Sequence, residues 1–117
     1  RGLVGSEMCI RDRIDATRVA GPQEIVLEYL LANKFGVRVC PHAGGVGLCE
    51  AVRHFAMSDY LAVSGQWDDR VIEYVDNQHE YFVHPTEIVN GRYKAPTAPG
   101  SGVDMKLEAA ERCLYKG

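Results

Sequence analysis

The chain has 117 residues, of which 46% are hydrophobic and 25% are charged, a composition typical of a soluble globular protein with one core. Thirteen basic and sixteen acidic side chains give a net charge of −3, with no block of like charges. This balance argues against a nucleic-acid surface or a polybasic membrane patch, and no apolar run approaches the about 20 residues that span a bilayer. The expected partner is therefore a small molecule, with no nucleic acid and no membrane.

The first residues are set apart from the fold. Residues 1–13 (RGLVGSEMCIRDR) lack the continuous apolar stretch of a signal peptide, and they resemble sequencing-adapter sequence translated as if it were coding. We expect this segment to be non-native and the natural protein to be longer. The four cysteines form no CxxC pair, which favours a reducing compartment. The expected location is the cytoplasm, with the mitochondrion as the alternative in a eukaryote.

The next elements alternate between strand and helix. Residues 14–19 are a short apolar run before a Gly-Pro turn, as expected for a strand. Pro22 suits the first turn of a helix, apolar residues then recur at helical spacing, and Gly36 ends the pattern. Residues 37–40 are a second short apolar run, which predicts a second strand.

A second unit repeats this order. Residues 47–57 again have helical spacing, with Leu48, Val52 and Phe55 on the inward face, and residues 60–63 are predicted as a third strand. Strand, helix, strand, helix, strand indicates parallel strands joined by right-handed crossovers, which is the α/β class.

Three parallel strands leave two unpaired edges, so they are not a finished domain. A closed (β/α) barrel has about eight units in about 250 residues. We therefore predict that residues 14–66 are the last three strands of such a barrel with their intervening helices. Residues 67–117 are expected to be an irregular tail with a Pro/Gly linker at 95–102 and a terminal helix at 104–114.

Two polar residues at the ends of predicted strands are the candidate catalytic residues. Asp15 and His42 are separated by about one βα repeat, which places them at equivalent levels on neighbouring strands about 4.8 Å apart. A carboxylate bonded to one imidazole nitrogen fixes the tautomer of the ring, giving an acid/base dyad. A structural histidine and a turn-capping aspartate are the alternatives, and the loop Gly44–Gly47 alternatively predicts a phosphate-binding nest.

Four segments carry a family resemblance: IDATRV, CPHAGGVGLCEAVRHFAMSDY, RVIEYVDNQHEYF and NGRYKAPTAPGSGVDMK. From Ile14 onward the chain resembles the C-terminal part of the enolase superfamily, in its mandelate-racemase-like subgroup, and within it the L-fuconate dehydratases. The resemblance implies that the tail returns towards a capping domain, and that the full-length protein is a homo-oligomer.

The activity that the resemblance implies is Mg²⁺-dependent loss of water from a sugar acid. A lysine removes the proton next to the carboxylate, the metal stabilises the ene-diolate, and a histidine protonates the departing hydroxyl. Carried over, His42 is that acid, Asp15 orients it, and Glu73 lies near the substrate, with a solvated surface carboxylate as the alternative for Glu73. The family's lysine base and Mg²⁺ ligands come from earlier strands, so no metal ligand is assigned in this chain.

Three other interpretations remain open. One is another sugar-acid dehydratase or racemase of the same subgroup, using the same dyad. The second is a small α/β module that binds an anion at Gly44–Gly47. The third concerns the isolated chain, which we expect to be inactive and not to fold stably alone, because its sheet has exposed edges.

Overall fold

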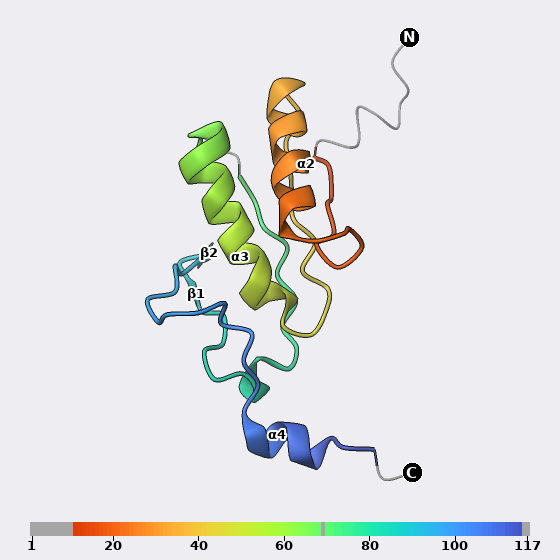
Figure 1. The fold of residues 1–117 in the computed structure, drawn as a ribbon. Helices are drawn as coiled ribbons and strands as arrows, with labels where there is room; N and C mark the ends of the chain where they lie inside the picture. The colour runs from red at the N-terminus through yellow and green to blue at the C-terminus, as the bar shows by residue number, and fades with distance from the viewer. Residues whose placement is uncertain (1–10, 69, 116–117) are drawn as a thin grey trace.

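The computed structural model describes residues 11–68 and 70–115. Its two longest helices are α2, Pro22–Lys34, and α3, Leu48–Ser58, which lie side by side in orange and green (Figure 1). Both helices were expected from the spacing of their apolar residues. Gly47 precedes α3 with a φ of 71°, in the left-handed region that favours glycine.

The predicted third strand at residues 60–63 is wrong. The backbone continues from α3 into a π-helix, η1, Asp59–Ser64, which ends at Gly65 with a φ of 61°. A short apolar run is compatible with either strand or helix. No glycine or proline interrupts the chain from Leu48 to Ser64, so nothing in the backbone stops the helix before Gly65.

The strand predicted at residues 14–19 is wrong in position: residues 16–20 are turns and bends, and the pairing with the second predicted strand begins at Asp12. The two segments lie beside each other as short extended pieces. Asp12 and Val39 form an isolated parallel bridge, and the His42 amide donates to the carbonyl of Ile14 at 2.8 Å. The third neighbour comes from further along the chain than expected, since the amide of Glu73 donates to the carbonyl of Pro41 at 3.2 Å. These three segments bring residues 14–15, 42 and 73 to one place.

The tail contains a hairpin that the sequence reading did not predict. Strands β1, Ile88–Val89, and β2, Arg92–Tyr93, pair antiparallel through a turn at Asn90 and Gly91, whose φ angles are 51° and 73°. Asn-Gly is the preferred pair for such a tight turn, so the signal was present in the sequence.

The rest of the tail is largely irregular, as expected. It includes a short 3-10 helix, η2, His79–Tyr81, and the terminal helix α4, Leu107–Arg112, which is shorter than the predicted 104–114. Figure 1 places α4 at the far end of the molecule from α2. The division of the chain at residues 13 and 66 remains a prediction.

The core consists of two clusters on either side of the extended pieces. One lies under α3 and the other under α2, and their buried members are Ala43, Leu48, Cys49, Val52, and Ile25, Tyr29, Val39. Leu48 and Val52 are buried and Phe55 is partly buried, as the helical pattern predicted. None of the helices in the described residues is both long enough and apolar enough to cross a membrane.

Candidate functional site

His42 lies in a cluster of charged side chains where the extended pieces meet. Its Nδ1 atom is 2.6 Å from Oε2 of Glu73, and the amide of Ala43 donates to the same oxygen at 2.8 Å. The Arg13 guanidinium donates to the other oxygen of Glu73. The carboxylate is thus held from three sides and in turn holds one edge of the imidazole.

These contacts locate a proton on the ring. An ionised carboxylate only accepts hydrogen bonds, so Nδ1 of His42 must carry the proton that it shares with Glu73. Nδ1 is then unable to accept a bond from Arg13, although the guanidinium lies 3.3 Å away. The other nitrogen, Nε2, is left to react, which is the arrangement that an acid/base histidine needs.

Asp15 lies beside the ring but does not make the expected hydrogen bond. Its Oδ2 is 3.9 Å from Nε2 of His42, an ion-pair distance that is too long for a hydrogen bond. Oδ1 accepts from the Thr17 hydroxyl at 2.7 Å and the Thr17 amide at 2.9 Å, while Oδ2 pairs with Arg18 at 3.2 Å. The structure therefore gives Asp15 a turn-capping contact together with its place near the ring.

Both carboxylates are ionised at neutral pH. The Thr17 hydroxyl and amide lower the pKa of Asp15, and the amide of Ala43, helped by Arg13, lowers the pKa of Glu73. Arg13 and Arg18 balance these two negative charges. The cluster is therefore a pair of salt-bridged carboxylates with an imidazole between them.

The open side of the ring depends on a glycine. A Cβ atom on Gly44 would lie 2.5 Å from Cε1 and 3.0 Å from Nε2 of His42, too close for any side chain. The His42 side chain is 31% exposed, so a small molecule can reach it. Gly44 thus leaves room beside the nitrogen that is free to react.

The glycine loop does not present an open anion site. A Cβ atom on Gly47 would meet the ring of Phe82 at 3.0 Å, so the loop is covered there. The contacts favour the acid/base interpretation of this loop over the phosphate nest.

In the described part of the chain, no three His, Cys, Asp or Glu residues are grouped so that they could hold a metal ion. The carboxylates near His42 are already bonded to arginines, amides or hydroxyls. Mg²⁺ prefers several free oxygen ligands and water in octahedral geometry. The residues that the structure describes therefore do not fit a Mg²⁺ site.

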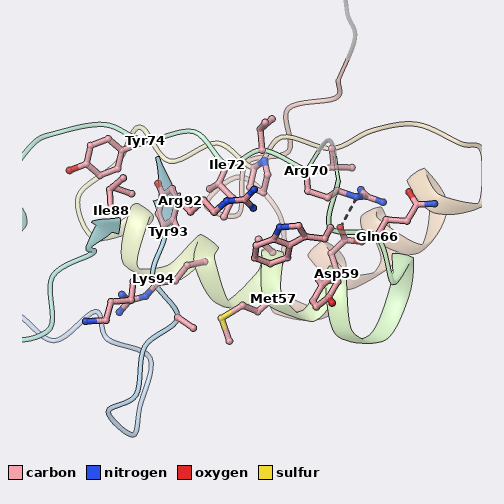
Figure 2. A pocket seen from close by; sticks show the side chains of 18 of the residues that line it. Met57, Asp59, Gln66, Arg70, Ile72, Tyr74, Ile88, Arg92, Tyr93 and Lys94 are labelled. Carbon is pink, nitrogen blue, oxygen red and sulfur yellow. Dashed lines mark ion pairs between the residues drawn. The ribbon is translucent and has the colours of Figure 1, made fainter. Parts of the chain in front are cut away.

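A cavity of about 330 Å³, shown in Figure 2, is lined by other residues than Asp15, His42 and Glu73. Val39 and Pro41 line it, and because alternate residues of an extended segment face opposite sides, His42 faces away from it. Inside, Asp59 pairs with Arg70 at 3.2 Å, and Arg92 lies over the ring of Trp67. The Oδ1 atom of Asp59 has no hydrogen-bond partner among the described residues, and burial raises the pKa of Asp59, but no histidine lines the cavity beside this carboxylate.

The sequence reading brought the three proposed residues to the right place but missed some of their partners. Arg13 was overlooked because residues 1–13 were excluded from the fold, and of that segment the structure describes only residues 11–13. The amide of Ala43 carries no sequence signal, since every residue but proline has one. Glu73 was expected near the substrate, which stays a prediction, and its contact with His42 was not foreseen.

The fold and this cluster together define the strand-end region of a β/α barrel. Residues 10–110 match the family model described as enolase C-terminal domain-like. The chain belongs to this family, as the resemblance predicted.

Curated relatives extend this result. The chain is 47% identical over 97 residues to mitochondrial enolase superfamily member 1 of Xenopus laevis, covering 83% of the chain and 22% of that protein. It is 44% identical over 105 residues to the L-galactonate dehydratase of Hypocrea jecorina, covering 90% of the chain and 23% of that protein. The chain is also similar to the crystal structure of human mitochondrial enolase superfamily member 1, with 44% identity and a TM-score of 0.83. This match covers 88% of the chain and 23% of the human protein chain. The chain therefore spans less than a quarter of the length of these relatives.

Proposed function

We propose that the chain is the C-terminal piece of a sugar-acid dehydratase and that His42 is its general acid. The observation that carries this proposal is the fixed imidazole: Nδ1 is bonded to Glu73 at 2.6 Å, while Nε2 is left beside the space at Gly44. The likeness to an L-galactonate dehydratase supports the reaction class.

The part of the reaction assigned to this chain is a proton transfer. Once the proton next to the substrate carboxylate has been removed, the electron pair forms the C2–C3 double bond as the C3–O bond breaks. His42 acts in its doubly protonated form: Nε2–H donates its proton to the departing hydroxyl, which leaves as water, and the ring remains neutral with its proton on Nδ1. The enol then becomes a 2-keto-3-deoxy acid. Glu73 holds the ring in place during this step, and Asp15 keeps a negative charge near it.

The proposed substrate is L-fuconate, with L-galactonate as the second candidate. L-Fuconate is the 6-deoxy form of L-galactonate, so the two acids share their configuration and differ only in the hydroxyl at C6. The relative named L-galactonate dehydratase supports the same stereochemical class. Comparing the two acids on the longer protein would decide between them, since a site that bonds the C6 hydroxyl rejects the deoxy acid strongly.

Because no described residues fit a Mg²⁺ site, no step is assigned to a metal within this chain. The removal of the first proton is likewise assigned to the remainder of a longer protein. The isolated chain is accordingly proposed to be inactive, and a full-length protein is proposed to assemble as a homo-oligomer.

The test uses a protein of the relatives' length that carries this chain. We expect His42→Asn to lower the rate of keto-acid formation by about 100-fold or more, because general acid catalysis contributes on that order. Exchange of the substrate α-proton in D₂O should continue, since another group removes that proton.

His54→Asn is the matched control, because His54 lies on α3 and its ring bonds only to the carbonyl of Ser101. This variant should retain both reactions. Unchanged keto-acid formation by His42→Asn would refute the role of His42. Exchange of the α-proton without loss of water in the unmodified protein would instead favour a racemase.

A further inference from the structure

A second histidine in the chain lies between two hydrogen-bond acceptors. Nδ1 of His79 is 2.8 Å from Oε1 of Glu50, and Nε2 of His79 is 2.9 Å from the carbonyl oxygen of Val75. A carbonyl only accepts, and Oε1 of Glu50 also accepts from the amide of Thr86 at 3.0 Å. With Glu50 ionised, both nitrogens of His79 carry protons, which makes the ring an imidazolium.

The surroundings agree with a charged ring. Glu50 is 1% exposed and the His79 side chain is 14% exposed, so the pair is largely shielded from water. Burial opposes the charge on His79, but the bonds to Glu50 and Val75 outweigh it and raise the pKa of His79. The other groups that face this ring are Tyr74, stacked at 5.4 Å, and the nearby carboxylate of Asp76.

This ion pair contacts the segment that carries Glu73. His79 bonds the carbonyl of Val75 and stacks on Tyr74, so it contacts the two residues that follow Glu73. The Tyr93 hydroxyl donates to the carbonyl of Glu73 itself. The bond from His79 is the charge-assisted one, and such bonds are about twice as strong as neutral ones.

Glu50 connects His79 and its contacts to the loop that carries His42. Glu50 lies in the first turn of α3, and α3 begins directly after the loop that carries His42. The first turn of α3 is therefore connected to both groups: to the His42 ring through the loop that precedes the helix, and to the Glu73 segment through Glu50 and His79. A helix turn is a rigid reference, whereas residues 73–76 have no regular structure of their own.

We propose that His79, paired with Glu50, is a positioning residue that fixes Glu73 against Nδ1 of His42. This proposal rests on the function proposed for His42, because it concerns how the acid is held. His79 touches neither the substrate space nor the His42 ring, and acts only through the 73–75 segment.

The test is histidine NMR on a protein of the relatives' length that carries this chain and is labelled with ¹⁵N-histidine. In the unmodified protein, we expect two N–H protons on His79 at pH 7, and a downfield, protected Nδ1–H proton on His42. In His79→Gln, the His42 proton should exchange with water roughly tenfold faster, the change expected when the net contribution of one hydrogen bond is lost. His54→Gln is the matched control and should leave the His42 proton unchanged.

A folded His79→Gln protein with an unchanged His42 proton would overturn the proposal, as would a single N–H proton on His79 at pH 7. If that variant does not fold, raising the pH of the unmodified protein is the second measurement. The His42 proton should then lose its downfield position in step with the deprotonation of His79, and a fixed position through that titration would also overturn the proposal. No substrate is needed, so either result is independent of the test of the dehydratase reaction.

Discussion

At the scale of single residues, the space beside His42 depends on one missing methyl group. We predict that Gly44→Ala displaces the imidazole, because the new Cβ would lie 2.5 Å from Cε1 of His42. In a protein of the relatives' length, a misplacement of about 1 Å is expected to lower the rate by about 100-fold. Gly45→Ala is the matched control, since its Cβ would meet Leu48 at an ordinary 3.5 Å. Equal keto-acid formation by both variants would contradict this role of Gly44.

The charge on Glu73 makes a second residue-scale prediction, on acid stability. The amide of Ala43 and the guanidinium of Arg13 lower the pKa of Glu73 below its ordinary value of 4.5. Its contribution to folding is therefore present above that value and is lost as the pH falls through the lowered pKa. In a protein of the relatives' length, we expect the free energy of unfolding to decrease more in the unmodified protein than in Glu73→Gln as the pH falls below 4.5.

Glu87→Gln controls for a general loss of negative charge. Glu87 also pairs with a cation, Lys94 at 2.7 Å, but its side chain is 59% exposed, and exposed pairs contribute little. Denaturant titrations at several pH values would measure the difference between the variants. A steeper acid response for Glu87 than for Glu73 would contradict the prediction.

How much of the site the sequence predicts follows from the range of each interaction. The sequence could place Asp15 near His42, because one βα repeat has a regular length that brings equivalent positions together. It could not predict that the two side chains lie too far apart for a hydrogen bond. Glu73 entered only through the family resemblance, since its segment follows an irregular connection without a period. The bond between Glu50 and His79 has no sequence signal, because a glutamate on a helix is normally expected to face water.

At the scale of elements, α2 buries fewer of its apolar side chains than its sequence suggests. Ile25 and Tyr29 are buried, whereas Leu27, Leu30 and Leu31 are each nearly half exposed. In a protein of the relatives' length, we predict that Ile25→Ala lowers the free energy of unfolding by about 2–4 kcal/mol, since it removes fully buried methyl groups. Leu27→Ala should change it by less than about 1 kcal/mol. Urea titration of both variants checks this, and similar losses would contradict it.

The elements themselves were predictable where their signals were long. The helical spacing of residues 22–34 and 48–58 extends over several turns and is bounded by proline or glycine, so both helices were found. Residues 60–63 are only four apolar residues, too few to distinguish a strand from a helix, and in the structure the helical backbone of α3 continues through them. The extended segments around Asp12 and Val39 pair at an isolated bridge. The sequence predicted that two such segments exist, but it placed the first of them a few residues too late in the chain.

At the scale of the whole molecule, the chain is extended for its length. Its radius of gyration is 16.0 Å, compared with about 13 Å for a compact domain of about 100 residues. Phe35 and Leu61 are more than 70% exposed; Phe35 directly follows α2, and Leu61 lies in η1. Surfaces of this kind normally contact other protein, and the match to less than a quarter of each relative is consistent with such contacts.

This shape predicts how the isolated chain unfolds. Two small core clusters expose little new surface on unfolding, so the dependence of the unfolding free energy on urea should be below about 1 kcal/mol/M, the lower end for small proteins. The exposed leucines should also cause self-association, so light scattering should rise with concentration. Within a protein of the relatives' length, the same residues should unfold in one cooperative step, because the neighbouring strands would cover the edges. A steep, concentration-independent transition for the 117-residue chain alone would contradict this and would mean that the two clusters are sufficient for a stable fold.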